Sequence, residues 1–158
     1  MSKPRIVVRR SPIHGRGVFA NVEVPAHTRL LEYRGERIDS AEAFRRYGDN
    51  SGLGETYLFA VNAHWLIDGN VGGSGARFIN HGCAPNCDAV IWVDIDGDER
   101  RDRVYIETRR RIRKGEEISF DYALEPSHAL SEAERERWRC RCGAKHCRGT
   151  LLAPASGP

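Results

Sequence analysis

The stretch CRCGAKHC, residues 140–147, constrains the fold more than any other part of this sequence. It places three cysteines, Cys140, Cys142 and Cys147, within eight residues. Such spacing lets the backbone wrap around one tetrahedral metal ion, and structural zinc is held by four ligands. We therefore expect a zinc site in which these three thiolates are joined by a fourth side chain from elsewhere.

The fourth ligand has a local candidate and two distant ones. His146 is local, but it directly precedes Cys147, and turning both side chains onto one ion would strain the backbone. Cys83 and Cys87, in RFINHGCAPNC (77–87), are the distant candidates. Either could close the site only if the tail folds back over this segment, and zinc would then fasten the two together.

Composition is that of an ordinary globular domain. The 158 residues are 40% hydrophobic and 30% charged, and the net charge of +3 indicates no particular partner. Five cysteines without an apolar run suited to a signal peptide argue against a disulfide framework. Five free buried thiols are the alternative, but the clustering favours a metal site. We expect a cytoplasmic location, with a nucleus or delivery into a host cell left open, and no membrane partner.

Short apolar runs broken by Gly, Pro and Asp predict a mainly β fold. The expected strands are 5–10, 17–20, 29–38, 56–61, 64–68, 88–95, 103–110 and 117–122. Expected helices are 39–48, beginning at Asp39 or Ser40, and 131–138, beginning with a Ser131–Glu134 capping box, with a further helical turn in 75–81. Residues 94–102 predict a hairpin loop turning at Asp96-Gly97, and 113–117 a tight turn.

Four blocks in this order resemble the SET-domain family of protein lysine methyltransferases. They are IHGRGVFA (13–20), YLFAVNAHWLIDGNVGGSGARFINHGCAPNC (57–87), KGEEISFDY (114–122) and CRCGAKHCRGTLL (140–152), within a resemblance that spans residues 5–152. It implies the SET-domain (β-clip) fold, with several short sheets, short helices, and a knot-like crossing of the Asn-His segment and the last strand. The implied parts are a catalytic domain (1–125), a connecting helix (126–138), a post-SET zinc-binding tail (139–152) and a disordered end (153–158).

The resemblance also implies the site. Its cofactors are S-adenosylmethionine and Zn²⁺, and its substrate is a lysine-containing protein or peptide, histone-like or other. Cys83 becomes the fourth zinc ligand beside Cys140, Cys142 and Cys147, and Cys87 a packing thiol. The implied cofactor contacts are His14, Gly15, Arg16, Gly17, Tyr57, Asn80, His81 and, between two zinc ligands, Arg141. The chain departs from the family at Gly82, where serine is usual.

Methylation of lysine needs a neutral amine, which a free lysine with a pKa near 10.4 offers about once in a few thousand molecules at neutral pH. A narrow apolar channel beside the cationic sulfonium lowers that pKa. Tyr122 matches the catalytic tyrosine of the family, and Phe120 shares its face of the strand. By resemblance Phe120 sets the number of methyl groups added, and a phenylalanine there predicts di- or trimethylation.

Three alternatives remain at this stage. His81 could act as a general base, although a lone histidine in an apolar segment is more often a satisfied core group. The chain could be a catalytically inactive SET-like module that binds peptides. It could also be a zinc-stabilised nucleic-acid module that uses RRRIRK (109–114), but the acids that follow cancel much of this charge. We do not expect nucleic acid as a substrate, and the sequence predicts no oligomeric state.

Overall fold

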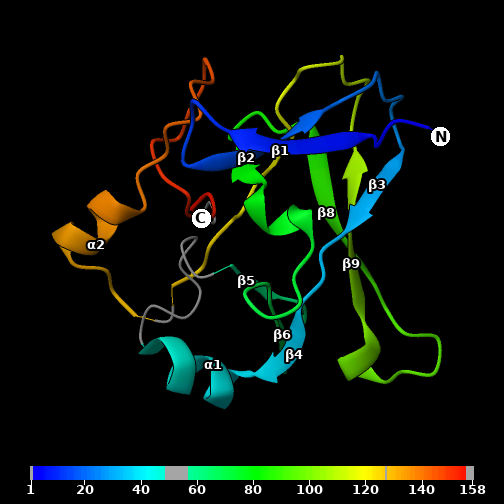
Figure 1. Ribbon diagram of the computed structural model, residues 1–158. Helices are drawn as coiled ribbons and strands as arrows, with labels where there is room; N and C mark the ends of the chain where they lie inside the picture. The colour runs from blue at the N-terminus through cyan, green and yellow to red at the C-terminus, as the bar shows by residue number, and fades with distance from the viewer. Residues whose placement is uncertain (1, 49–56, 127, 156–158) are drawn as a thin grey trace.

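The computed structural model describes residues 2–48, 57–126 and 128–155. Short strands dominate these residues, and the helices lie at the periphery (Figure 1). The strands are β1 (Ile6–Arg10), β2 (Arg16–Ala20), β3 (Arg29–Glu32), β4 (Glu36–Asp39), β5 (Leu58–Ala60), β6 (Trp65–Asp68), β7 (Asn80–His81), β8 (Cys87–Trp92), β9 (Arg103–Thr108) and β10 (Ser119–Phe120). The helices are α1 (Ser40–Tyr47) and α2 (Glu132–Arg137), with 3-10 turns at η2 (Gly75–Phe78) and η3 (Glu99–Arg101).

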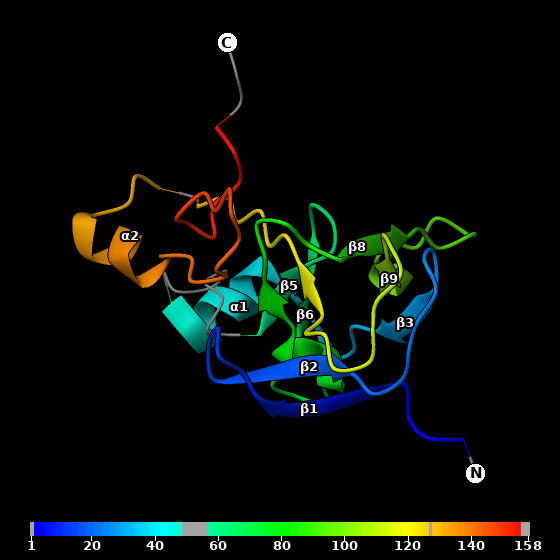
Figure 2. The same cartoon turned by 90° about the horizontal axis from the view of Figure 1, so that it is seen from above.

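These strands form several small sheets, so the predicted mainly β fold is confirmed. β1 and β2 form an antiparallel hairpin, β9 lies between β3 and β8, and β6 lies between β4 and β5. β10 pairs in parallel with β7, with Ser119 opposite Asn80 and Phe120 opposite His81. This pairing brings the last strand to the Asn-His segment, as the resemblance implied. Figure 2 shows α2 at one end of the molecule and β3, β8 and β9 toward the other.

The predicted strand 29–38 is wrong in one respect, because the chain changes sheets within it. β3 pairs with β9, whereas β4 pairs with β6, and Tyr33–Gly35 separates the two. At Gly35 a Cβ atom would lie 2.2 Å from the carbonyl oxygen of Asp68, so only glycine allows the chain to pass β6 this closely.

The other expected elements differ mainly in length. The last predicted strand, 117–122, is shortened to β10. Thr56, at the start of the predicted strand 56–61, lies outside the described residues, as do residues 156–158 of the predicted disordered end. The hairpin of β8 and β9 is confirmed, and its loop has Gly97 at a φ of 77° and a 3-10 turn at η3.

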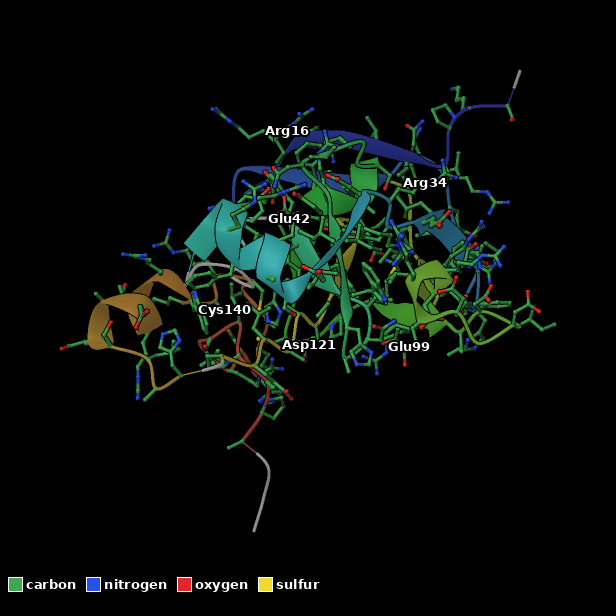
Figure 3. All side chains as sticks on the ribbon, turned by 90° about the horizontal axis from the view of Figure 1, so that it is seen from below. Arg16, Arg34, Glu42, Glu99, Asp121 and Cys140 are labelled. Carbon is green, nitrogen blue, oxygen red and sulfur yellow. The ribbon has the colours of Figure 1, made fainter. Side chains whose placement is uncertain are left out.

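Both predicted helices form where their caps indicate. Asp39 accepts a hydrogen bond from the backbone N–H of Glu42 at 2.8 Å, which begins α1, and Gly48 ends it with a φ of 61°. Glu42 can be seen on α1 in Figure 3. Ser131 and Glu134 form the capping box of α2. No helix in the part of the chain that the structure describes is both long and apolar enough to cross a membrane.

The hydrophobic core holds the crossing of β7 and β10 in place. Ile79 and Ile118, next to these strands, are at most 1% exposed and pack with Val18, Ile67 and Ile106. Burying an isoleucine side chain contributes about 1.5–3 kcal/mol, whereas one hydrogen bond contributes about 0.5–1.5 kcal/mol net. Core packing therefore fixes the crossing more firmly than its two-residue ladder does.

Candidate active site and metal centre

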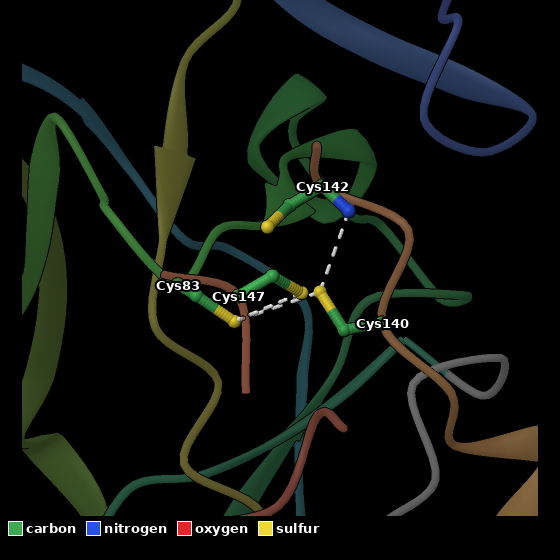
Figure 4. Close-up of side chains that lie close together, drawn as sticks. All are labelled: Cys83, Cys140, Cys142 and Cys147. Carbon is green, nitrogen blue, oxygen red and sulfur yellow. Dashed lines mark hydrogen bonds between the residues drawn. The ribbon is translucent and has the colours of Figure 1, made fainter. Parts of the chain in front are cut away.

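Four cysteines gather at one point of the structure, from two distant parts of the chain (Figure 4). The sulfur atoms of Cys83, Cys140, Cys142 and Cys147 all lie within 4.8 Å of one another. The Cys83 sulfur is 3.6 Å from that of Cys140 and 3.9 Å from that of Cys147. A tetrahedral zinc with bonds of about 2.3 Å sets its sulfur ligands about 3.8 Å apart, so the arrangement fits zinc.

The same geometry separates the candidates for fourth ligand. Cys83 joins the three tail cysteines, whereas His146 is exposed and outside the group. Cys87 is fully buried at the start of β8, and burial raises the pKa of its thiol to about 12. This thiol therefore remains protonated and packs in the core, as the resemblance implied.

Backbone N–H groups point at these sulfurs. The N–H of Arg148 lies 3.4 Å from the sulfur of Cys83, and the N–H of Cys142 lies 3.4 Å from that of Cys140. A third N–H, from Gly149, lies 3.3 Å from the sulfur of Cys147. Donors aimed at sulfur stabilise its thiolate form, which is the form that binds a metal.

The tail is attached to the segment after β10 by main-chain contacts. The N–H of Leu124 donates to the carbonyl of Leu151 at 3.1 Å, and the N–H of Ala153 donates to the carbonyl of Leu124 at 3.0 Å. The tail also pairs with itself, with Arg139 opposite Thr150. Residues 139–152 therefore fold against the segment that follows Tyr122.

Asn80 organises the glycine loop of the first block. Its side-chain amide donates to the carbonyls of His14 and Arg16 at 3.1 Å each, and to a carboxylate oxygen of Glu117 at 2.9 Å. A Cβ atom on Gly17 would lie 2.2 Å from that same carboxylate oxygen. The missing side chain of Gly17 therefore makes room for Glu117, a reason that the sequence alone did not suggest.

The ring of His81 lies between the cysteine cluster and the tyrosine block. Its Nδ1 accepts a hydrogen bond from the backbone N–H of Tyr122 at 3.0 Å, and its Nε2 lies 3.3 Å from the sulfur of Cys83. This pattern assigns the ring proton to Nε2. Burial lowers the pKa of His81, which favours the neutral ring. Both nitrogens already have partners, which argues against His81 as a general base.

A pocket of about 380 Å³ opens beside Tyr122. Its walls combine aromatic and aliphatic side chains with one arginine and one glutamate. It is lined by Tyr33, Tyr57, Leu58, Phe59, Ala60, Leu66, Arg77, Ile79, Phe120, Tyr122, Ala123, Leu124 and Glu125. The ring centroids of Phe120 and Tyr122 are 5.0 Å apart, and those of Phe59 and Phe120 are 6.1 Å apart.

The hydroxyl of Tyr122 is fixed by a short hydrogen bond that it donates to the carbonyl of Ile79. Burial raises the pKa of Tyr122 well above its usual value, so the phenol stays protonated. With its hydrogen directed at Ile79, the oxygen can offer only lone pairs to a molecule in the pocket. Tyr122 is therefore suited to orienting a donor group and poorly suited to acting as a base.

Of the eight predicted cofactor contacts, all of which the structure describes, only Tyr57 is among the residues that line this pocket. Tyr57 lines it with a φ of 55°, and its carbonyl accepts a hydrogen bond from the hydroxyl of Tyr33 at 2.9 Å. Arg16 is exposed, with its guanidinium 4.5 Å from the centroid of the Phe78 ring. Gly15 has a φ of 46°, and Arg141 is exposed on the tail.

Three residues with a clear structural role were missed from the sequence. Glu117 accepts hydrogen bonds from Ser11 at 2.7 and 2.9 Å, and Asn86 contacts the backbone of both Glu117 and Ser119. Asp121 forms an ion pair with Arg148 at 2.8 Å. Strand alternation in EISFDY could have indicated Glu117 and Asp121, because both fall on the face opposite Phe120 and Tyr122.

Comparison with known proteins assigns the family. The SET domain model matches residues 15–123. The chain is 39% identical over 151 residues to the histone-lysine N-methyltransferase set-2 of Caenorhabditis elegans, with 94% of this chain and 9% of the relative covered. It is 39% identical over 152 residues to the H3 lysine-4 specific histone-lysine N-methyltransferase of Saccharomyces cerevisiae, with 94% and 13% covered. The chain belongs to the SET domain family.

The similarity extends to animal proteins of much greater length. Human histone-lysine N-methyltransferase 2D is 37% identical over 150 residues, which cover 92% of this chain and 2% of the relative. The chain therefore spans only a small fraction of each of these three relatives. It corresponds to a part of them that contains the SET domain.

Proposed function

We propose that this chain is a protein-lysine N-methyltransferase that transfers a methyl group from S-adenosylmethionine to a lysine side chain. The observation that carries this proposal is the pocket of about 380 Å³, lined by aromatic rings, beside the fixed hydroxyl of Tyr122. The relatives support it, because they are named histone-lysine N-methyltransferases and match over nearly all of this chain. This activity requires a substrate protein with an exposed lysine, and we propose a histone-like protein in that role.

The cofactor would be held by the loop 14–17, the Asn80–His81 segment, Tyr57 and Arg141, and it supplies an activated methyl group. The side-chain amide of Asn80 is already occupied by hydrogen bonds to the loop and to Glu117. We infer that Asn80 positions the loop, and that its cofactor contacts and those of His81 come from backbone groups. Cys83, Cys140, Cys142 and Cys147 would hold zinc, which fits their sulfur spacing.

The pocket prepares the lysine for reaction. Aromatic and aliphatic walls remove water from the ammonium group, and desolvation lowers its pKa toward neutrality. The amine then donates a hydrogen bond to the oxygen of Tyr122, whose own hydrogen is held by Ile79. Positioning of this kind can supply much of a rate enhancement without a base in the protein. The proton of the ammonium leaves to solvent before the nitrogen forms its new bond.

Phe120 bears on the number of methyl groups added. Its ring lines the pocket beside Tyr122 and is 6% exposed. A phenylalanine leaves more room than a tyrosine and holds no water by a hydrogen bond. We therefore propose di- or trimethylation.

The rival nucleic-acid function has less support. In the basic run, Arg109 lies 3.7 Å from Asp88, Arg110 lies 3.0 Å from Glu116, and Arg111 lies 3.4 Å from Glu23. These ion pairs neutralise part of the charge on which such a function would depend. The cytoplasmic location stays a prediction from the sequence.

The test is a calorimetric titration with S-adenosylmethionine, followed by transfer of labelled methyl to histones and to a mixture of cellular proteins. We expect saturable cofactor binding and label on lysine. An inactive peptide-binding module would instead bind peptide without transfer. The proposal would be contradicted if zinc-loaded protein binds the cofactor but labels no lysine in the histones or in the cellular proteins.

A further inference from the structure

Arg148 joins the tail to the segment after β10 that contains Asp121 and Tyr122. Its guanidinium donates to both carboxylate oxygens of Asp121 at 2.8 Å each, a two-pronged ion pair. The side chains are 24% and 30% exposed, so the pair is partly shielded from water. Two parallel hydrogen bonds fix orientation as well as distance. Arg148 therefore sets the direction in which the Asp121 carboxylate points.

Arg148 also contacts the cysteine cluster and the end of the tail. Its backbone N–H lies 3.4 Å from the sulfur of Cys83, and its guanidinium donates to the carbonyl of Leu152 at 3.0 Å. Arg148 thus contacts the cysteine cluster, the end of the tail and the segment after β10 that contains Tyr122. Movement of the cluster or of the end of the tail would therefore shift the Asp121 carboxylate through Arg148.

Asp121 in turn holds the turn that follows Tyr122. Its Oδ1 accepts a hydrogen bond from the backbone N–H of Ala123 at 2.9 Å. Ala123 has a φ of 44°, in the left-handed region that disfavours residues with a Cβ. Such a conformation persists only where the surroundings enforce it. Ala123 and Leu124 line the pocket, so this turn forms part of its wall.

The negative charge of Asp121 stabilises its hydrogen bonds with Arg148 and Ala123. Burial alone would raise the pKa of Asp121, but hydrogen bonds from Arg148 and from the N–H of Ala123 outweigh it and lower the pKa below its usual value. Asp121 is therefore ionised at neutral pH and remains an acceptor for both partners.

We propose that Arg148 and Asp121 are positioning residues: their ion pair holds Ala123 in its left-handed conformation and thereby sets the pocket wall next to Tyr122. The inference deepens the proposed lysine methylation and rests on it for its catalytic consequence. Its structural part, the restraint of Ala123, does not depend on that function.

The test compares Arg148→Gln with a matched control, Arg139→Gln. Each arginine is next to a cysteine of the cluster, Arg148 after Cys147 and Arg139 before Cys140. Arg139 pairs instead with Glu136 at 3.2 Å, and both of these side chains are more than 60% exposed. Both variants are measured for bound zinc, for hydrogen exchange at the Ala123 amide, and for methyl transfer to a lysine peptide.

We expect one zinc per chain in both variants. In Arg148→Gln, the Ala123 amide should exchange at least tenfold faster, and kcat/KM should fall about ten- to a hundredfold, because small misplacements of reacting groups cost rates of this order. Arg139→Gln should match the parent protein in both respects. Adding Ala123→Gly to Arg148→Gln should restore part of the loss in kcat/KM, because glycine adopts a positive φ without strain.

Unchanged exchange at Ala123 in zinc-loaded Arg148→Gln overturns the inference. Loss of zinc from that variant also overturns it, since Arg148 would then serve to retain the metal. A double variant no more active than Arg148→Gln overturns the route through Ala123. A parent protein that transfers no methyl contradicts the proposed function instead, and the exchange measurement then still decides the restraint of Ala123.

Discussion

The hydroxyl of Tyr122 is held by the carbonyl of Ile79, and the phenol has a raised pKa because it is buried. In Tyr122→Phe the pocket should keep its shape but lose the oxygen that we propose orients the amine. We expect kcat to fall about a hundred- to a thousandfold, as for removal of one group that stabilises a transition state. The Kd for S-adenosylmethionine, measured by calorimetry, should stay within a factor of about two. Retained activity in this variant would remove Tyr122 from the mechanism.

Phe120 lines the pocket beside Tyr122, where it can limit the space for methyl groups. Phe120→Tyr adds a hydroxyl at the wall of the pocket, within an aromatic group in which the Phe120 and Tyr122 rings are 5.0 Å apart. The hydroxyl takes up space and can hold a water that occupies the place of a further methyl group. Mass spectra of a lysine peptide should show di- or trimethyl product with the parent protein and mostly monomethyl product with the variant. Identical product distributions would exclude a role for this position.

For some individual residues the sequence alone does not determine the role. Spacing alone predicted three tail ligands and left Cys83, Cys87 and His146 open as the fourth. The choice depends on where residue 83 lies in space, which only the resemblance or the structure provides. For Gly17 the resemblance implied a contact with the cofactor, whereas the structure places the carboxylate of Glu117 against the glycine.

At the scale of elements, the approach of β2 to the tyrosine block gives a stability prediction. Gly17→Ala would place a Cβ atom 2.2 Å from a carboxylate oxygen of Glu117, which is held by Ser11 and Asn80. Because Glu117 cannot move without losing these bonds, we expect a loss of about 1–3 kcal/mol in the free energy of unfolding. Urea titration measures it.

Gly75→Ala, in η2, is the matched control. A Cβ atom there would meet only a methyl group of Val8 at 3.4 Å, an ordinary contact. Its free energy of unfolding should stay within about 0.5 kcal/mol of the parent. A Gly17→Ala protein as stable as this control would show that the Glu117 side chain can move away from residue 17 without a loss of stability.

Elements were predictable where signals are local and were missed where the partner is distant. Caps located α1 and α2, and the Asp-Gly turn located the β8–β9 hairpin. The periodicity of 29–38 could not show that the chain changes sheets at Gly35. The resemblance implied that the Asn-His segment and the last strand cross, and the structure adds that they pair in parallel as β7 and β10. At Gly82, where the family usually has serine, a Cβ atom would lie 2.7 Å from the hydroxyl of Ser119, so packing accounts for the glycine.

At the scale of the whole molecule, Asp68 links α1 to β6. Its carboxylate is 0% exposed and accepts hydrogen bonds from Arg46 at 2.9 Å and Tyr47 at 2.8 Å. Burial would raise its pKa, but these bonds and those from Asn70 outweigh it, so the pKa of Asp68 is lowered. A lowered carboxyl pKa adds stability above the unfolded value, near 3.9, which is lost as the pH falls through the folded value.

The corresponding variant is Asp68→Asn. It should lose about 1–3 kcal/mol of unfolding free energy at neutral pH, because it removes a charge that is bonded to Arg46. The difference from the parent should shrink as the pH falls below about 4, where the carboxyl of the unfolded parent chain begins to take up its proton while that of the folded chain is still ionised. Urea titrations of both proteins across this range measure it. A difference that is constant with pH would show that the charge of Asp68 is not the source of the stability.

The cysteine cluster belongs to the same scale, because it brings residue 83 together with the last part of the chain. Structural zinc contributes on the order of 10 kcal/mol, comparable with the entire stability of many domains. In this structure the cluster also touches His81, whose ring contacts the backbone of Tyr122. We therefore propose that the tail 139–152 is part of the catalytic unit, in contact with the domain predicted for 1–125.

The most direct measurement is mass spectrometry of a lysine-containing histone peptide after incubation with S-adenosylmethionine. It is made with zinc-loaded protein, with protein stripped by a chelator, and with stripped protein reloaded with zinc. We predict methyl groups on the lysine ε-nitrogen with the loaded and reloaded protein, and a loss of at least tenfold in rate after stripping. Equal transfer by stripped and loaded protein, or none by loaded protein on any lysine offered, would contradict a methyltransferase whose lysine pocket depends on a zinc-held tail.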